Sequence, residues 1–169
     1  MTARAFLMLL CLTGIASPAL ALDMSIRPNA AEMMSMPPFC AAKFNLKQGS
    51  PEWNAWRDRI GENFIDIHHY CFALVAVKRY WGARTKQDRG FYLQRALNNY
   101  DYIVNAAKPD FALRAEVHAG RGEVFMLMGR PGEAAKDFNQ ALVINPKYVK
   151  PYLQLADLHA AGKSTGRAL

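Results

Sequence analysis

Hydrophobic residues recur every three or four positions between Ser50 and Trp81. The segment begins with Ser50-Pro51-Glu52, the order of a helix start: a capping side chain, a proline at the first helical position and an acid in the first turn. The apolar stripe that follows contains Trp53, Trp56, Ile60, Phe64, Ile67, Cys71 and Leu74. This spacing predicts a long helix with one apolar face, which Gly61 either kinks or divides in two.

The pattern after Trp81 predicts further helices separated by short turns. Residues 82–90 (GARTKQDRG) are expected to be a basic loop, followed by a helix at about 91–107. Another helix is expected at 113–128. A last one runs from about 147 to 161, where Gly162 would break it.

The segment around the turn at residues 129–132 has a regular spacing of small and aromatic residues. In order these are Gly122, Phe125, Ala134, Phe138, Ala141 and Pro146. The small residues allow two antiparallel helices to approach closely, and the two phenylalanines fill the space between them. This segment resembles the tetratricopeptide repeat (TPR) family, whose helix–turn–helix unit is about 34 residues long. It departs from the family pattern at His118 and Arg121, where that pattern has Trp and Leu.

The pattern recurs along the chain, as expected of a repeat protein. One repeat length after His118, Arg121, Gly122 and Ala134 stand Tyr152, Leu155, Ala156 and Ala168. Upstream, Ala96, Tyr100 and Ile103 repeat the spacing of the second helix. The resemblance therefore implies an all-α fold of stacked antiparallel helical hairpins, with five to six helices. The expected units are a long helix and a degenerate hairpin at 50–114, a repeat at 115–148 and a partial repeat at 149–169.

The first 49 residues are expected to contribute little regular structure. Residues 1–21 have one arginine, a short apolar run and Ala-Leu-Ala, which predict a secretory signal peptide cleaved after Ala21. Lipidation at Cys11 is an alternative, although Leu10 precedes it where a small residue is usual. Neither this run nor any other stretch is long enough for a membrane-spanning helix. The sequence of residues 22–39 predicts an extended leader. Residues 41–49 are expected to form a linker or a short helix.

Export makes a disulfide the expected state of the two cysteines that remain after cleavage, Cys40 and Cys71. Two separate buried thiols are the alternative. Because Cys71 lies on the apolar stripe, the disulfide would fasten the leader to the helical body. A periplasmic or secreted location follows from the same signal.

The resemblance also implies where a partner binds. TPR proteins hold ligands on the concave side of their first helices, and the repeat register places Glu116, Glu123, Met126, Lys150 and Asp157 there. The two glutamates are seven residues apart, which puts them on one face of a helix. Their carboxylates favour a basic peptide as the ligand. A solvated polar face without a ligand is the alternative.

The adjacent histidines His68 and His69 suggest a second kind of site, for a metal ion or haem. However, neighbouring residues point about 100° apart on a helix, so the two rings cannot easily share one metal. Packing beside the disulfide, with a hydrogen bond to the leader, is the preferred role. There is no GxSxG, P-loop, HExxH or CxxCH motif. We therefore expect no enzymatic activity and no cofactor.

The formal net charge of the chain is +7, and it becomes +6 once Arg4 leaves with the signal. An exported protein rarely meets nucleic acid, so acidic proteins, anionic polymers or lipid head groups are the expected partners. Positive charge concentrates at Lys78, Arg79, Arg84, Lys86 and Arg89. These residues form either a solvated face or a patch for an anionic surface.

The last predicted helix would leave an apolar edge at the end of the repeat stack, because no full partner helix follows it. The stripe consists of Tyr148, Tyr152, Leu155 and Leu158. A homodimer, a partner protein or the C-terminal tail folding back would cover this edge. Together these features predict an exported adaptor that binds a protein or peptide. Its expected role is as an accessory part of a cell-envelope assembly, such as secretion, pilus or polysaccharide machinery.

Overall fold

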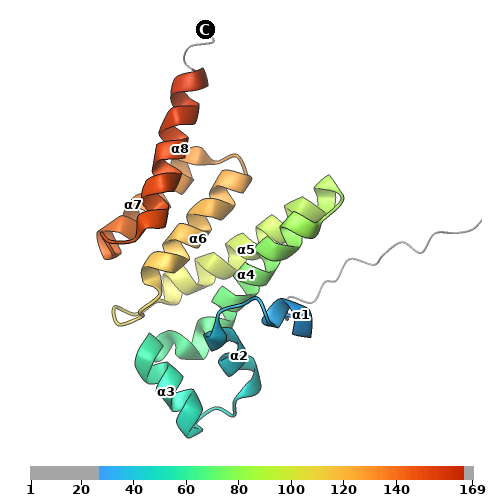
Figure 1. Cartoon of the computed structure of the whole chain (residues 1–169), viewed down its shortest axis with the longest axis vertical. Coiled ribbons are helices and arrows are strands. Elements are labelled where there is room, and N and C mark those ends of the chain that lie inside the picture. The colour runs from blue at the N-terminus through green and yellow to red at the C-terminus, as the bar shows by residue number, and fades with distance from the viewer. Residues whose placement is uncertain (1–26, 166–169) are drawn as a thin grey trace, which may run out of the picture.

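The computed structural model of the chain describes residues 27–165, with side chains to residue 161. Every regular element in this range is helical, which confirms the all-α prediction (Figure 1). The elements are α1 (Ala30–Met33), α2 (Pro38–Asn45), α3 (Pro51–Ile60), the 3-10 helix η1 (Glu62–Asp66), α4 (Ile67–Gly82), α5 (Lys86–Ala106), α6 (Arg114–Leu127), α7 (Pro131–Ile144) and α8 (Val149–Thr165). The predicted signal peptide lies outside the described residues.

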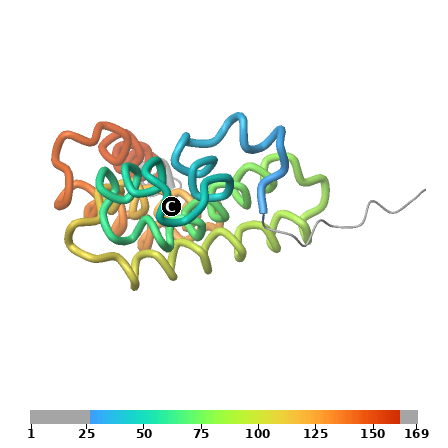
Figure 2. The backbone as a smooth tube through the Cα atoms, turned by 90° about the horizontal axis from the view of Figure 1, so that it is seen from below, coloured from blue at the N-terminus to red at the C-terminus, as the bar shows by residue number. Residues whose placement is uncertain are grey.

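The helices from α4 onward form a stack of antiparallel pairs. Helix α4 packs against α5 and α6 packs against α7, while α5 contacts α6 and α7 contacts α8. Figures 1 and 2 show α4, α6 and α8 as successive first helices of this stack. The predicted arrangement of stacked hairpins is therefore present.

Two glycines on α6 bring the neighbouring helices into close contact. A Cβ atom on Gly122 would lie 2.6 Å from the ring of Phe138 on α7, and one on Gly120 would overlap the phenol of Tyr100 on α5. Both rings are buried, with Tyr100 2% and Phe138 0% exposed. Only residues without a side chain leave room for these two rings.

The predicted long helix is divided at Gly61, one of the two outcomes that the sequence left open. Gly61 has φ 103°, a conformation that glycine adopts without strain. A Cβ atom there would lie 2.7 Å from the backbone oxygen of Asp110, because the loop before α6 crosses at this point. The Ala112 N–H donates to the Ile60 oxygen across the same contact at 2.8 Å.

The prediction of an extended leader at 22–39 is wrong where α1 forms, whereas α2 is the short helix that was one of the two outcomes expected after Cys40, and it begins earlier, at Pro38. Helix α1 begins at a capping box. The Glu32 backbone N–H donates to the Asn29 side chain, and the Asn29 backbone N–H donates to the Glu32 carboxylate. Helix α2 begins with Pro38 at its first position. The predicted count of five to six helices was too low because of α1, α2 and the break at Gly61.

Three contacts fasten this N-terminal segment to α4. The predicted disulfide joins Cys40 to Cys71, and both residues are fully buried. The Arg79 guanidinium donates to both carboxylate oxygens of Glu32 at 2.7 and 2.9 Å. These hydrogen bonds, against the opposing effect of burial, hold the pKa of Glu32 below its usual range. The ammonium of Lys78 donates to the Ser35 hydroxyl.

Two predicted helix ends are also corrected. Helix α5 begins at Lys86, inside the expected basic loop, because the Thr85 hydroxyl accepts from the Asp88 N–H and caps the helix. Helix α8 continues through Gly162 to Thr165. A single glycine lowers helix stability by only about 1 kcal/mol, which does not suffice to end a helix.

The disulfide generates the first prediction. Thiol counting on denatured, unreduced protein is expected to find no free thiol at Cys40 or Cys71. Replacing either cysteine with serine should lower the free energy of unfolding by about 3–4 kcal/mol, because the bridge closes a loop of about 30 residues in the unfolded chain. Urea unfolding measures this change. Two titratable thiols at these positions would show that the bridge does not form.

Candidate functional site

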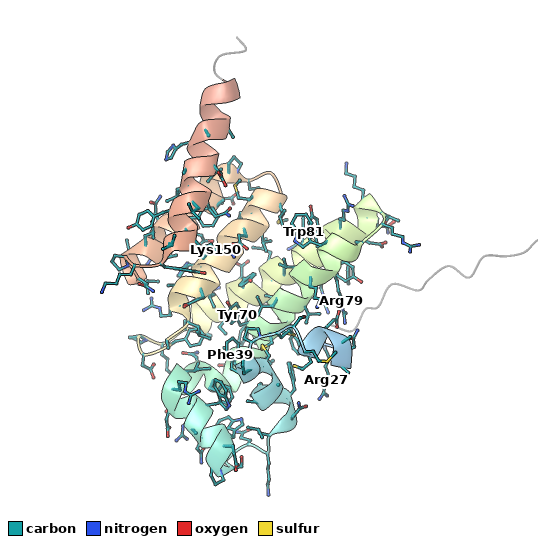
Figure 3. The ribbon with its side chains drawn as sticks, in the orientation of Figure 1. Arg27, Phe39, Tyr70, Arg79, Trp81 and Lys150 are labelled. Carbon is teal, nitrogen blue, oxygen red and sulfur yellow. A yellow bond between two sulfur atoms is a disulfide. The ribbon has the colours of Figure 1, made fainter. Side chains whose placement is uncertain are left out.

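The first helices of the three successive units contribute to one groove. Its lining residues come in pairs four positions apart, Val77 and Trp81 on α4, Glu123 and Leu127 on α6, and Lys150 and Gln154 on α8. Side chains with this spacing project from the same face of a helix. The groove encloses about 280 Å³. Figure 3 shows Trp81 and Lys150 on either side of α6.

The groove combines an apolar surface with one ion pair. The Trp81 side chain is 68% exposed, and Val77 and Leu127 beside it are half-buried. Across the groove, the Lys150 ammonium lies 2.5 Å from a Glu123 carboxylate oxygen. The Lys150 side chain is 51% exposed and that of Glu123 is 28% exposed, so the pair is only partly shielded from solvent. This chemistry suits the binding of an apolar side chain with polar groups on either side of it.

A segment of the chain itself closes the side of α4 next to the groove. Phe39 of α2 stacks on Tyr70, with ring centroids 5.9 Å apart, in contact with the N-terminal half of α4 (Figure 3). Burial raises the pKa of Tyr70, and the nearby Tyr148, Glu116 and Glu123 raise it further. Helix α2 therefore leaves only the Trp81 end of α4 open to a partner.

The five predicted partner-binding residues do not lie together in the groove. Glu123 and Lys150 line it and pair with each other. Glu116 lies two turns earlier on α6, with one carboxylate oxygen buried and without a hydrogen-bond partner among the described residues. Met126 packs against the hydrophobic core, and Asp157 is exposed on α8 outside the groove lining.

Four lining residues were missed by the sequence analysis: Val77, Trp81, Leu127 and Gln154. The available signal was the repeat register itself. The repeat register identifies α4 as the first helix of the degenerate unit, but the predicted site did not include the exposed face of this helix. Trp81 had been assigned to the apolar stripe of the long helix, and so to the core.

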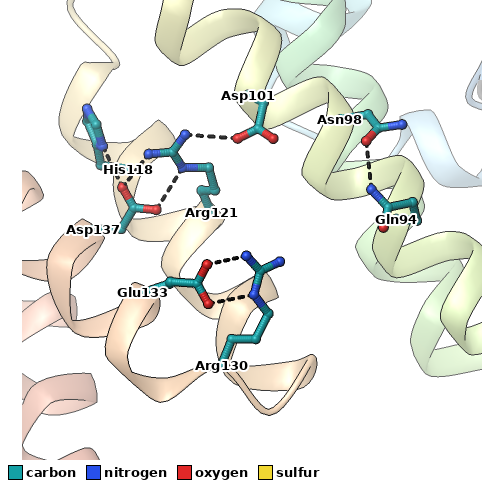
Figure 4. A network of polar contacts seen from close by, with 8 residues as sticks. All are labelled: Gln94, Asn98, Asp101, His118, Arg121, Arg130, Glu133 and Asp137. Atoms are coloured by element: carbon teal, nitrogen blue, oxygen red, sulfur yellow. Dashed lines mark hydrogen bonds and ion pairs between the residues drawn. The ribbon is translucent and has the colours of Figure 1, made fainter.

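A polar network lies on the opposite face of α6 (Figure 4). The Arg121 guanidinium donates to Asp137 of α7 at 2.7 and 2.8 Å and to Asp101 of α5 at 2.9 Å. His118 Nδ1 lies 2.9 Å from the same Asp137 carboxylate. Burial alone would raise the pKa of Asp137, but the hydrogen bonds from His118 and Arg121 outweigh it and hold this pKa below its usual value of 3.8.

This network explains the departures from the family pattern at His118 and Arg121. An apolar residue at either position would remove one of the two partners of the buried Asp137. The His118–Asp137 pair has the geometry of an acid–base dyad. However, the pair belongs to a network that joins α5, α6 and α7 and does not line the groove, so its contacts assign it to structure.

His68 and His69 pack against aromatic side chains. His69 Nδ1 lies 2.9 Å from Asn99 Oδ1, and its ring stacks on Tyr102 with centroids 3.7 Å apart. A hydrogen bond to the leader was expected from His68 or His69, but His69 is instead paired with Asn99 of α5. Burial and the neighbouring His69 lower the pKa of His68. Within residues 27–165, no three His, Cys, Asp or Glu side chains gather closely enough to hold a metal ion.

The predicted basic patch is smaller than the sequence suggested, because Lys78 and Arg79 hold α1 in place. The predicted terminal edge is also changed. Leu155 and Leu158 pack against the core, and Tyr148 is half-buried. Among the described side chains of α8, the large apolar ones that are exposed are Val149, Tyr152 and Leu153, at 65%, 51% and 61% exposure.

In the part of the chain that the structure describes, no helix is long and apolar enough to cross a membrane. A scan against protein-family models matches residues 115–148 to the model described as tetratricopeptide repeat. These residues comprise α6, α7 and the turn that leads to α8. Searches of curated proteins and of solved structures found no match.

The buried network gives a prediction about pH. Because the pKa of Asp137 is lowered on folding, its contribution to stability is present above the pKa of the unfolded carboxyl and is lost as the pH falls below about 4. Asp137→Asn should lower the free energy of unfolding by about 1–3 kcal/mol at neutral pH. On acidification, the free energy of unfolding should decrease less in this variant than in the wild type. Urea unfolding between neutral and acid pH measures both effects.

Asp58→Asn is the control for this comparison, because its carboxylate is 69% exposed and pairs only with Arg57 among the described residues. An equal pH dependence in the wild type and in Asp137→Asn would contradict the assignment.

Proposed function

Because residues 115–148 are a tetratricopeptide repeat, through which the chain belongs to that family, we propose that this protein is an adaptor that binds a segment of another protein in the groove between α4, α6 and α8. The observation that carries the proposal is the position of Trp81, which is 68% exposed on the face shared by the first helices. An exposed tryptophan beside aliphatic side chains is a typical anchor of a protein interface.

The buried contacts support binding through a fixed surface. The glycine contacts of α6 and the network around Asp137 hold α6 between α5 and α7, on which α4 and α8 pack. A groove that is already formed loses little conformational entropy when a partner binds. TPR units generally act as interaction scaffolds rather than as enzymes, and we propose the same here, without a cofactor.

The proposed place of action is the cell envelope, in the periplasm or outside the cell. The N-terminal sequence that ends at Ala21 supports export, and a disulfide is stable in such an oxidising compartment. Secretion, pilus and polysaccharide machinery remain the candidate assemblies. A homodimer through the C-terminal edge, predicted from Tyr148, Tyr152, Leu155 and Leu158, also stays a prediction. The exposed large apolar side chains there are Val149, Tyr152 and Leu153.

Metal or haem binding at His68 and His69 is the second candidate function. The contacts of His69 with Asn99 and Tyr102 favour a packing role for this ring. Metal analysis and a visible absorption spectrum of the purified protein distinguish the two functions.

The groove generates a prediction for Trp81→Ala. Truncating an aromatic anchor costs roughly 2 kcal/mol of binding free energy or more. The variant should therefore recover at least about tenfold less partner from an envelope extract. Because the Trp81 side chain is exposed, the free energy of unfolding of the variant should differ from that of the wild type by only about 0.5 kcal/mol. Quantitative pull-down and urea unfolding measure these two effects.

Two matched variants locate the binding surface. Tyr102→Ala removes another partly exposed aromatic residue, from α5, and should leave recovery unchanged. Tyr152→Ala removes one from the outer side of α8, about 200° around the helix from Lys150. If Tyr152→Ala abolishes recovery and Trp81→Ala does not, the partner binds the end of the stack and the groove is not the site.

Export gives a separate prediction. Protein isolated from its native cells should begin at Leu22, and it should appear in the periplasmic or extracellular fraction. N-terminal sequencing and fractionation test this. Protein that retains residues 1–21 in the cytoplasmic fraction would contradict export without affecting the proposal about the groove.

A further inference from the structure

Positive charge concentrates at the loop end of the α4–α5 pair. Residues 78–95 include six basic residues and one acid, Asp88, a net charge of five, while the whole chain has a net charge of +7. About a tenth of the chain therefore holds most of its excess charge. Figures 1 and 2 both place this loop at the edge of the molecule.

Three of these side chains are free to meet a partner. Arg84, Lys86 and Arg89, which we call the basic tip, are exposed, and no carboxylate pairs with them among the described residues. Within the tip, the Arg89 Nε donates to the backbone oxygen of Ala83 at 3.2 Å. Lys78 and Arg79 are engaged with α1.

The basic tip lies next to the groove along the chain. Arg84 follows Trp81 by three residues, so their Cα atoms are at most about 11 Å apart. The Debye length at physiological ionic strength is about 8 Å. Because this length is shorter than about 11 Å, Arg84 attracts mainly those ligand charges that lie on its own side of Trp81.

The groove itself does not offset this positive field. Its two charged lining residues, Glu123 and Lys150, form an ion pair and leave no net charge. Glu116 has one carboxylate oxygen buried, away from a ligand. Apart from this ion pair the groove lining is uncharged, so the lining by itself does not favour the basic peptide that the glutamates of the sequence had suggested.

We propose that the segment bound in the groove is acidic, with an apolar side chain against Trp81 and carboxylates beside it that face Arg84, Lys86 and Arg89. This inference rests on the proposed function of the groove and names the chemistry of its ligand. The carboxylates speed association and fix the direction of the segment, while the apolar contact supplies most of the affinity.

An anionic bilayer is the other surface that the basic tip could meet. Each basic residue near such a surface raises the affinity by roughly fivefold. Three residues give only on the order of a hundredfold, too little to hold a protein at a membrane without a second anchor. An acidic segment gains the apolar contact with Trp81 as well, so it is favoured over the bilayer.

The test uses the purified disulfide-bonded protein and a random dodecapeptide library displayed on phage. Selected peptides are synthesised, and their affinity is measured by fluorescence anisotropy. Four proteins are compared: the wild type, Trp81→Ala, the tip variant Arg84→Glu/Lys86→Glu/Arg89→Glu, and the control Lys47→Glu/Lys108→Glu/Lys136→Glu. The control changes the net charge equally, at exposed residues on other elements. Glutamates in the first turn of α5 are compatible with the helix dipole.

We expect enriched peptides with apolar residues flanked by Asp and Glu. The tip variant should bind them at least about tenfold more weakly, and the control variant as tightly as the wild type. Raising the salt from about 0.05 to about 0.5 M NaCl should weaken binding to the wild type and have little effect on the tip variant.

Other outcomes separate the two proposals. Neutral or basic peptides that require Trp81 would overturn the acidic ligand and leave the groove as the site. If no peptides are enriched, or if the enriched peptides bind Trp81→Ala as tightly as the wild type, both the groove as the site and the acidic ligand are overturned. If phosphatidylglycerol vesicles bind the wild type but not the tip variant, and acidic peptides bind neither, the basic tip is a bilayer contact and the inference fails.

Discussion

The arrangement of the helices depends on the two contacts that Gly120 and Gly122 of α6 make with the rings of Tyr100 and Phe138. These contacts face opposite neighbours, α5 and α7, so one helix sets the spacing to both. A larger residue at either position would push a fully packed ring outward, and the helices on that side would move with it. Because the groove lining comes from α4, α6 and α8, its width follows from this spacing.

The N-terminal segment limits the groove in a different way. The disulfide holds α2 on α4, and Phe39 then covers the Tyr70 ring. The ion pair of Glu32 with Arg79 fastens α1 to another side of α4 and removes a charge from the surface. The same contacts therefore stabilise the body, shorten the open part of α4 and confine the free positive charge to the basic tip.

The sequence predicted those features that depend on local spacing. The positions of Gly122, Ala134 and Phe138 identify the repeat, and Cys71 on an apolar stripe identifies one end of the disulfide. Features that depend on distant contacts were missed. The capping box of α1 was overlooked among prolines and methionines, and no spacing pairs Arg121 with Asp101. Trp81 belongs to the same apolar stripe as core residues, and only the ends of the neighbouring helices determine that it is exposed.

The sign of the ligand charge depends on such a distant contact. Glu123 alone would attract a cation, and its position on α6 is all that the repeat register provides. Lys150 arrives from the next unit and neutralises it, so the remaining field comes from a loop outside the matched repeat. In a repeat protein, each unit contributes one face to the shared groove, but neighbouring units and connecting loops determine the net charge there. The ligand preference of such a groove therefore has to be derived from the assembled stack rather than from a single repeat.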